Sequence, residues 1–560
     1  MFRYRFEKNR TQHYLKILDR LNKQYVVGGM DVHDALDSFE KEFPQIDGSH
    51  NWAVENYEQH AELTELVKDF ADVGADLLFL RLPPGQHEKW LKAALNAAER
   101  LQHLRAQSVH YGNLGILYRR MNLFSLGAQS LQKALYIAAE ISDRELQGWW
   151  YGNLGNLFLD ANQLSSVEKL LKSALNIATE LHDLRRAGIW MGNLGTYYAK
   201  KSDYVQALNT YGEALQFHQH VGDWRSIAHT LDNMGNAASL LGQLETAIQH
   251  HQQALEIAEK IKDNALIAHT AGNLAATLST YGRYSDAVPL HEKSLLGFEK
   301  LGDVAEQLIE YAKLAQTLRV LGELERVHYC YTSMFELAET NYSTEYQIQA
   351  LNGLGELARD VGQLETALAY HQRALVLARE THDSSAEQQT LAAIGIVYFE
   401  GGTHDAALEQ HLQAVEIASS LNDNWSLTQH LGNIANVYLA VGKPQDALDY
   451  LQQAIQIAKH HQRTRVIAAL TGNIGKSHHM MGNLEEAKHH YQIALEMAQD
   501  MQDQRNKANW HNNLGVVYAS LGKTDMASTH YLAAREIYLQ LGDVRNCRAV
   551  DNNMDLTLNN

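Results

Sequence analysis

The sequence predicts an all-α solenoid built from helix-turn-helix repeats, and three observations support this fold class. A tetrapeptide motif returns every 40 residues without insertion or deletion. Only five prolines occur among 560 residues, and Ala, Leu, Gln and Glu dominate the long segments, which favours helices. A chain of this length must either split into domains or grow along one axis, and the repeat favours growth along one axis.

The motif is Gly-Asn-Leu-Gly, and it sets the phase of the whole chain. Copies begin at Gly112, Gly152, Gly192, Asp232, Gly272, Gly432, Gly472 and Asn512. Three further copies keep the phase but not the letters, beginning at Ala312, Asn352 and Ala392. A fixed period over eleven copies indicates stacked units that share one continuous core.

Each copy carries the signals of two helices joined by a tight turn. A glycine stands ten residues after the start of the motif in most copies, from Gly242 to Gly522, and Asn122 and Asn162 replace it in the first two. These residue types predict a left-handed residue at the end of the first helix. The second helix closes at an aspartate, such as Asp143 or Asp223, which predicts an N-cap for the following helix.

Small residues predict where the two helices of a unit approach each other. Alanine recurs at two positions of the second helix, seven residues apart, as at Ala207 and Ala214. Seven residues are two helical turns, so both alanines lie on one stripe.

The pattern resembles the tetratricopeptide repeat. The resemblance is carried by Leu-Gly, by the two small residues and by a tyrosine three positions after the motif, at Tyr118, Tyr198, Tyr398, Tyr438 and Tyr518. It implies a right-handed superhelix of paired helices. The unit of 40 residues exceeds the usual length of about 34. Repeats of this longer form are similar to those of spindle-orientation adaptors and of many bacterial multi-repeat sensors.

The repeat divides the chain into four predicted regions. Residues 1–61 form a divergent N-terminal helical region, 62–103 a divergent first repeat, 104–543 eleven repeats, and 544–560 a capping helix and tail. Fragments at 34–43 and 51–56 are expected to be separated by a turn at Pro44 and Gly48, and 62–81 is expected to be one helix. Pro83 and Pro84 are expected to open the helix that contains 90–101.

The N-terminal stretch resembles the segment that leads into the repeats of bacterial STAND-type signalling NTPases. The resemblance rests on FEKEF, HNWA and LLFLRLPPGQHEKWLKAALNAAERL, in that order. The phosphate-binding loop of those proteins is missing here, so the resemblance implies a sensor arm alone.

Charge and composition restrict the partners. The net charge of −18 disfavours nucleic acid, whose binding relies on clustered Lys and Arg. The sequence contains neither a secretory signal nor an apolar run of about 18 residues, so we expect no membrane association. Cys330 and Cys547 have no metal-type spacing and suit a reducing compartment. We expect a cytoplasmic protein.

The asparagine of the motif is the main candidate for binding a partner. Its copies are Asn113, Asn153, Asn193, Asn233, Asn273, Asn433, Asn473 and Asn513, and Asn553 follows in the C-terminal segment. It lies about 100° from the buried leucine, toward the expected concave surface. Stacked carboxamides match the C=O and N–H groups of an extended peptide. In the peptide-binding clamps of the family the equivalent asparagine contacts the ligand backbone. The alternative is that it bonds a neighbouring helix and sets repeat spacing.

Residues three and four positions before the asparagine are expected to line the same groove. Trp149, Trp150 and Trp190 are candidate anchors, with packing against the N-terminal helices as the alternative, and His229 and His269 are further candidates. Lysine is missing from these positions, which disfavours clamping of a terminal carboxylate. The asparagines give way to Lys313, Gly353 and Ala393 in the centre, where a separate subsite, a bend and simple drift all remain open.

The sequence contains no motif for catalysis, and we expect no cofactor. We find no nucleophile elbow, phosphate loop or kinase set. Histidine pairs such as His250-His251, His478-His479 and His489-His490 are adjacent residues, which diverge on a helix, and we interpret them as ordinary polar surface and not as a metal site.

The sequence therefore favours a non-catalytic scaffold that binds a protein or peptide in its groove. One alternative is a regulatory subunit that senses a ligand and acts on a separate effector. A weaker alternative is an enzyme whose site is built from groove residues.

Overall fold

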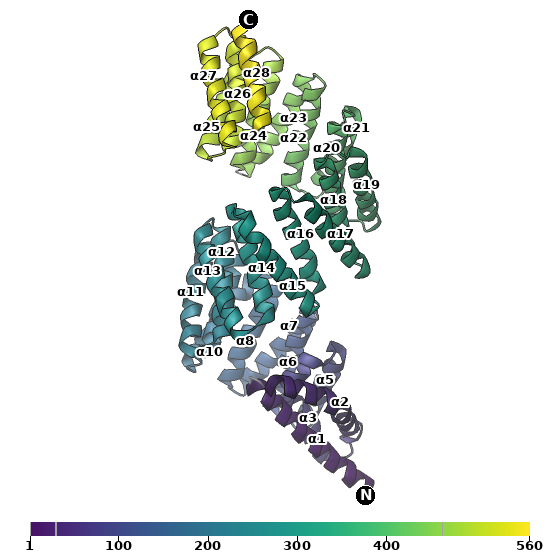
Figure 1. The fold of residues 1–560 in the computed structure, drawn as a ribbon. Helices are drawn as coiled ribbons and strands as arrows, with labels where there is room; N and C mark the ends of the chain where they lie inside the picture. The colour runs from purple at the N-terminus through teal and green to yellow at the C-terminus, as the bar shows by residue number, and fades with distance from the viewer. Residues whose placement is uncertain (1, 28–30, 462, 542, 560) are drawn as a thin grey trace. The chain divides into compact units, whose positions relative to one another are not determined.

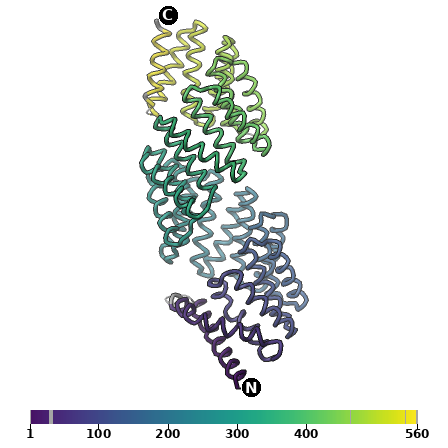
Figure 2. Tube along the Cα trace, turned by 90° about the vertical axis from the view of Figure 1, so that its right-hand side faces the viewer, coloured from purple at the N-terminus to yellow at the C-terminus, as the bar shows by residue number. Residues whose placement is uncertain are grey.

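The computed structural model describes residues 2–27, 31–461, 463–541 and 543–559. Its 28 α-helices and one short 3₁₀ helix (Leu164–Ser166) follow one another without a strand in the described residues. The chain divides into two compact units, residues 1–297 and 298–560. Within each unit, successive antiparallel helix pairs stack side by side (Figures 1 and 2). Among the described residues, no helix is long and apolar enough to cross a membrane.

Unit 1 begins with the helices α1 (Phe2–Val27) and α2 (Asp31–Asn56). The turn expected at Pro44 and Gly48 is absent, because α2 runs through both residues. Phe39, Ile46 and Ala53 on one face of α2 are buried to 2% exposure or less. Burial of this apolar face outweighs the backbone hydrogen bond that proline cannot donate.

The segment 62–81, expected to be one helix, is divided into α3 (Ala61–Val73) and α4 (Ala75–Arg81). Gly74 separates them, and a Cβ at this residue would lie 2.7 Å from Cδ2 of Leu18 on α1. Leu18 thus packs directly against the backbone at the break. The next helix, α5 (Pro84–Arg100), begins at the predicted proline pair.

Eleven helix pairs then follow, each with the motif in its first helix. In unit 1 they are α6 (Leu104–Arg120) with α7 (Phe124–Glu140), α8 (Arg144–Asp160) with α9 (Val167–Glu180), α10 (Leu184–Lys200) with α11 (Tyr204–Val221), α12 (Trp224–Leu240) with α13 (Leu244–Ile261), and α14 (Asn264–Tyr281) with α15 (Tyr284–Leu301), which contains the division between the units.

Unit 2 continues the series and ends with a single helix. Its pairs are α16 (Val304–Leu321) with α17 (Leu324–Thr340), α18 (Thr344–Asp360) with α19 (Leu364–Glu380), α20 (Ser384–Glu400) with α21 (His404–Ser420), α22 (Asn424–Ala440) with α23 (Pro444–His460), α24 (Thr464–Met480) with α25 (Leu484–Asp500), and α26 (Gln504–Ser520) with α27 (Thr524–Gln540), followed by α28 (Val544–Asn559).

The turn and cap predictions are confirmed. Residues at the end of the first helix have positive φ, from 56° at Asn162 to 91° at Gly282. The predicted aspartates accept a hydrogen bond from the backbone N–H three residues later, as Asp143 does from Leu146 at 3.0 Å. An exposed arginine of the preceding repeat adds an ion pair to five of these caps. These pairs are Arg105–Asp143, Arg185–Asp223, Arg225–Asp263, Arg465–Asp503 and Arg505–Asp543.

Where the motif ends in glycine, one buried residue of the second helix packs on that glycine in the same repeat. We call it the knob position, and it lies 16 residues after that last motif residue. A Cβ on Gly115 would lie 2.5 Å from its knob, Leu131. Tyrosine or histidine stands there in other repeats, including His251, His291, His371 and His411. All four are at most 1% exposed, so interpreting the His250-His251 pair as polar surface was wrong for His251.

Two of the knob histidines, His371 and His411, make the core sensitive to acid. Burial, together with the charge of His430, lowers the pKa of His411 from 6.5 to about 4. The unfolded chain therefore binds a proton that the folded chain refuses between pH 6.5 and 4, so stability falls as pH falls through this window. Nδ1 of His411 is also buried without a hydrogen-bond partner among the described residues.

We expect His411→Leu to flatten the loss of stability between pH 6.5 and 4, and to cost nothing at pH 7.5. Leucine fills the same position at Leu131, Leu171 and Leu451, and its introduction removes a buried unpaired nitrogen. Urea unfolding measured across this pH range tests the prediction. His220→Gln, at an exposed histidine, is the matched control and should leave the acid slope unchanged. An unaltered slope in His411→Leu would contradict the account.

Candidate partner-binding surface

The first helices of consecutive repeats form one surface in each unit, which we call the first-helix face. The motif asparagines lie on it, and all eight candidates from Asn113 to Asn513 are half-buried. Each side chain therefore has one side in the repeat stack and one side open. This agrees with their expected place beside the buried stripe, and leaves both predicted roles possible.

Several asparagines bond the neighbouring repeat. Nδ2 of Asn193 donates to Oδ1 of Asn156 at 2.7 Å, and Nδ2 of Asn473 donates to Oδ1 of Asn436 at 3.2 Å. Asn273 donates in the same way to Oδ2 of Asp232, at 2.9 Å. These bonds support the alternative that the asparagine sets repeat spacing, at least at these three positions.

Other asparagines do not make this bond. Asn153 donates to the carbonyl of Trp149 in its own helix at 2.9 Å. In the described part of the chain, the carboxamides of Asn233 and Asn433 form no hydrogen bond within the protein. Asn113 lines a cavity of about 310 Å³ together with Tyr25 of α1 and Phe79 of α4. The asparagines thus fall into a bonded and an unbonded set, although all share one sequence position.

The residue three positions before the asparagine is buried between repeats. Trp150 is 1% exposed and donates from Nε1 to Oγ of Ser108 at 2.9 Å. Trp190 is 6% exposed. A shift of one residue turns a side chain by about 100°, so positions three and four before the asparagine cannot share one face. Burial therefore does not support Trp150 and Trp190 as direct anchors. Both rings pack inside the stack, but against the preceding regular repeat and not against the N-terminal helices named in the alternative.

These tryptophans explain the first glycine of the motif. A Cβ on Gly112 would lie 2.1 Å from Cη2 of Trp150, in the next repeat. The same relation joins Gly152 to Trp190 and Gly472 to Trp510. The ring occupies the space that a side chain would need.

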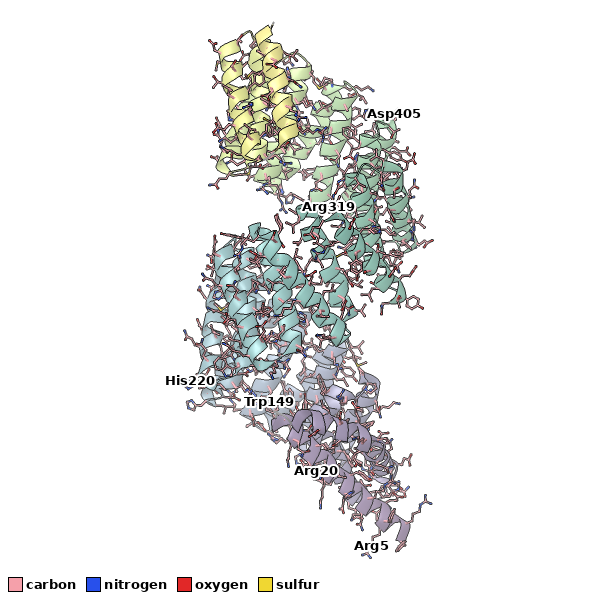
Figure 3. All side chains as sticks on the ribbon, viewed as in Figure 1. Arg5, Arg20, Trp149, His220, Arg319 and Asp405 are labelled. Carbon is pink, nitrogen blue, oxygen red and sulfur yellow. The ribbon has the colours of Figure 1, made fainter. Side chains whose placement is uncertain are left out.

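The residue four positions before the asparagine lies on the open side of the helix. Trp149 is half-buried, and the guanidinium of Arg186 lies 4.2 Å from its ring centre. His229 and His269 are exposed on α12 and α14. Figure 3 labels Trp149, which lies in unit 1, and Arg319, which lies in unit 2.

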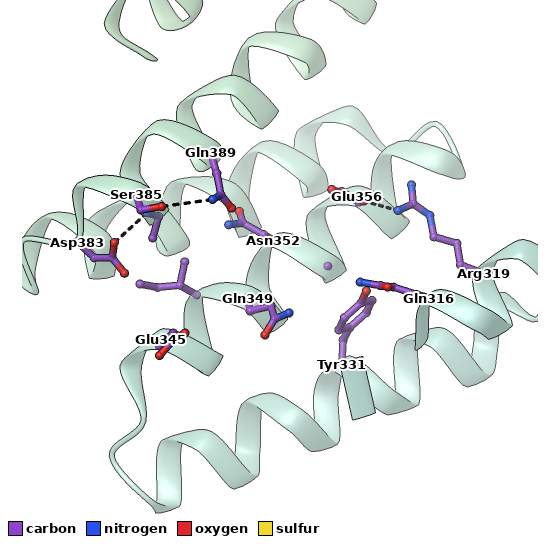
Figure 4. A pocket seen from close by; sticks show the side chains of 13 residues that line it. Gln316, Arg319, Tyr331, Glu345, Gln349, Asn352, Glu356, Asp383, Ser385 and Gln389 are labelled. Atoms are coloured by element: carbon purple, nitrogen blue, oxygen red, sulfur yellow. Dashed lines mark hydrogen bonds and ion pairs between the residues drawn. The ribbon is translucent and has the colours of Figure 1, made fainter. Parts of the chain in front are cut away.

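The interruption of the asparagine series coincides with a cavity. Around Gly353 in unit 2, a pocket of about 670 Å³ opens between α16, α17, α18 and α20. Its walls carry the amides of Gln316, Gln349, Asn352 and Gln389 (Figure 4). Of the three open hypotheses for this stretch, a separate subsite is the one that the cavity favours.

Tyr331 explains why glycine stands at position 353. Its ring lies 2.4 Å from the place of a Cβ on Gly353. Tyrosine knobs such as Tyr211 pack on the motif glycine of their own repeat, but Ala315 stands in that place here. Tyr331 therefore packs on the next repeat, which accommodates it with Gly353 in place of asparagine. Burial and the charge of Glu356 raise the pKa of Tyr331 to about 12.

Charges are distributed unevenly around this pocket. Arg319 lies at one end and is held by Glu356 and by Oδ2 of Asp360, the latter at 2.6 Å. Glu345 and Asp383 lie at the other end (Figure 4). Among the described residues, neither Glu345 nor Asp383 forms an ion pair.

Sequence reasoning missed Trp425, which is 45% exposed on the first turn of α22. The guanidinium of Arg463, in the next repeat, lies 5.1 Å from its ring centre. The available signal was phase, because Trp425 stands four residues before Gln429, and Gln429 stands four residues before Asn433, so the three lie on successive turns of one side of the helix. It is an exposed aromatic side chain on the first-helix face of unit 2.

Two of the histidine pairs face each other across a hairpin. His478 and His490 do meet across their hairpin, with stacked rings 5.4 Å apart. In the described ranges, however, no group of three or more His, Cys, Asp or Glu side chains is arranged to hold a metal ion.

A model of the tetratricopeptide repeat matches residues 106–180, 185–260, 226–300, 346–420, 387–460 and 466–540. These matches cover more than half of the chain, so the chain belongs to the tetratricopeptide repeat family. Such arrays serve in general as protein-interaction scaffolds. No curated protein matches the sequence.

Solved structures of similar fold share little sequence with this chain. BtubC from P. vanneervenii is 19% identical over 39% of this chain and 92% of its own, with a TM-score of 0.36. A STAND protein with a tetratricopeptide repeat sensor, from Pyrococcus horikoshii, is 14% identical over 70% of this chain and 55% of its own, with a TM-score of 0.43. The apo form of RapI is 16% identical over 50% of this chain and 99% of its own, with a TM-score of 0.39.

Proposed function

We propose that the chain is a non-catalytic scaffold whose first-helix face binds an extended peptide segment of a partner protein. The observation that carries this proposal is the unbonded set of motif asparagines. Asn233 and Asn433 are half-buried, and among the described residues their carboxamides have no hydrogen-bond partner. A carboxamide supplies two donors and an acceptor, which match a peptide backbone.

The surroundings of these asparagines suit a peptide of mixed composition. His229 lies one helical turn before Asn233 in unit 1, and Gln429 and Trp425 precede Asn433 on the same helix in unit 2; His269 stands in the same way before the bonded Asn273. Exposed aromatic and amide side chains supply contact area and hydrogen bonds without a fixed charge requirement. Trp425 replaces the buried Trp150 and Trp190 as the proposed aromatic anchor.

The test compares the unbonded with the bonded asparagines. We expect the double variant Asn233→Ala and Asn433→Ala to bind the partner more weakly. Each asparagine that contacts the peptide would lose two hydrogen bonds, together about 1.4 kcal/mol, which weakens the affinity about tenfold. Its unfolding transition should stay where it is. The affinity is measured by titration with the purified partner of the wild-type chain.

The matched control is the double variant Asn193→Ala and Asn473→Ala. Each substitution removes a bond between repeats, so we expect a loss of stability of about 1 kcal/mol at each site. Unchanged partner affinity in the first variant would overturn the proposal. Equal destabilisation of both variants would show that the whole series is structural.

A further inference from the structure

An internal salt bridge in unit 1 shows what the pocket of unit 2 lacks. In unit 1, Nη1 of Arg186 lies 2.5 Å from Oδ2 of Asp183 and 3.6 Å from Oε1 of Glu145. Its guanidinium also stacks on Trp149, with 4.2 Å between the guanidinium carbon and the ring centre. Two carboxylates of neighbouring repeats and one aromatic face thus hold a single guanidinium.

The same two carboxylates recur five repeat lengths further along the chain, as Glu345 and Asp383. The residue equivalent to Arg186 is Ala386, and the residue equivalent to Trp149 is Gln349. Both line the pocket of about 670 Å³. The cavity therefore lies where the guanidinium and its aromatic neighbour would stand.

The second cation of this arrangement is missing as well. In unit 1, Nη2 of Arg105 lies 3.6 Å from Oε2 of Glu145. The equivalent residue before Glu345 is Ala305. In other repeats an arginine 38 residues earlier forms an ion pair with the capping aspartate, as Arg225 does with Asp263 at 2.8 Å. The residue 38 positions before Asp383 is Glu345, so this cap has no such arginine.

The other groups at the pocket do not compensate these charges. Arg319 is engaged by Glu356 and Asp360 at the far end. One oxygen of Asp383 accepts the backbone N–H of Ala386 at 2.9 Å, which leaves its second oxygen for a ligand. The amides of Gln349 and Gln389 add hydrogen-bonding partners of no net charge (Figure 4). No set of ligands for a metal ion is present among the described residues.

We infer that this pocket binds the guanidinium group of an arginine side chain from a partner peptide, between Glu345 and Asp383. The inference rests on the proposed binding of a peptide by the first-helix face, and assigns one subsite and one side chain to it. A planar guanidinium can donate to both carboxylates at once, whereas an ammonium group lacks this fork. The partner's arginine takes the place that Arg186 occupies within the chain in unit 1.

The test uses a blocked pentapeptide, acetyl-Ala-Ala-Arg-Ala-Ala-amide, and the same peptide with citrulline, which keeps the shape but not the charge. Saturation-transfer NMR on the full chain, which detects weak complexes, measures both affinities. We expect the arginine peptide to bind at least tenfold more tightly, and its advantage to shrink at high salt. A lysine peptide should lie between the two.

Two variants of the pocket make the test specific. Ala386→Arg supplies the guanidinium from the chain itself, so it should abolish the preference for arginine while retaining the fold. Glu345→Gln combined with Asp383→Asn removes both charges, keeps a capping residue at 383, and should also abolish the preference. Glu365→Gln, at an exposed carboxylate of α19, is the control and should bind like the wild type.

The outcomes separate this subsite from the peptide-binding proposal. Equal binding of the arginine and citrulline peptides would overturn the guanidinium subsite, and leave peptide binding by the first-helix face intact. Undiminished arginine preference in Ala386→Arg would also overturn it. If neither peptide binds the wild type, the inferred guanidinium subsite is refuted. The asparagine variants test peptide binding by the first-helix face independently of this result.

Discussion

Trp150→Ala is expected to destabilise the repeats around α8 by about 3–5 kcal/mol, the usual cost of removing a buried tryptophan. Trp150 is 1% exposed, fills the space above Gly112, and donates a hydrogen bond to Ser108. Since its ring reaches from one repeat to the preceding one, the loss should be concentrated at the contact between these two repeats. Hydrogen exchange of α6 to α9, read by mass spectrometry, measures the change locally.

A local measurement is needed because long repeat arrays do not unfold in one step. Trp149→Ala is the neighbouring control. It removes a half-buried ring and its contact with Arg186, which contributes about 0.5–1 kcal/mol, so its exchange rates should change far less. If Trp150→Ala retained the exchange protection of the wild type, the tryptophan would not be the structural link that we describe.

Gly472→Ala should be the second most damaging substitution, at about 2–3 kcal/mol. Its Cβ would lie 2.1 Å from Cη2 of Trp510, and a buried indole ring cannot bend away from it. Alanine is otherwise the better helix former, so destabilisation here would run against intrinsic propensity. Chemical unfolding, together with hydrogen exchange of α24 and α26, measures the effect.

The chain contains its own control for this substitution. At Gly432 the next repeat has Leu470 in place of tryptophan, and a new Cβ would lie 3.6 Å from Cδ2 of that leucine. Gly432→Ala should therefore be neutral or stabilise by about 0.5–1 kcal/mol. Adding Trp510→Leu to Gly472→Ala should recover part of the stability, because it recreates the pair found at Gly432. Equal effects at the two glycines would contradict the ring-over-glycine packing.

Much of the fold could be predicted because its signals are local. A glycine that ends a helix, as at Gly282, or an aspartate that caps one, as at Asp143, acts within a few residues, and sequence displays such relations directly. The constant period then places each local signal in the same register. Conversely, Pro44 was misjudged because burial of Phe39 and Ile46, a tertiary effect, outweighs the local preference of proline.

The site was less predictable, because it depends on which side of a helix each residue occupies. Trp149 and Trp150 are adjacent in sequence, but the first is half-buried while the second is 1% exposed. The asparagines all occupy the same position of the repeat. Asn193 differs from Asn233 because it bonds the neighbouring repeat, and such contacts are visible only in the structure. Glycine stands at position 353 because Tyr331 packs there and not on Ala315 of its own repeat, and the sequence alone does not show this contact.

Photo-crosslinking tests the central claim, that the first-helix face binds the partner, most directly. A benzophenone amino acid is placed at His229 or Gln429 on this face, and at Gln252 or Gln452, exposed on the second helices of the same repeats. After illumination with the purified partner, we expect peptide adducts from positions 229 and 429 and only background from 252 and 452. Adducts confined to positions 252 and 452 would contradict the account.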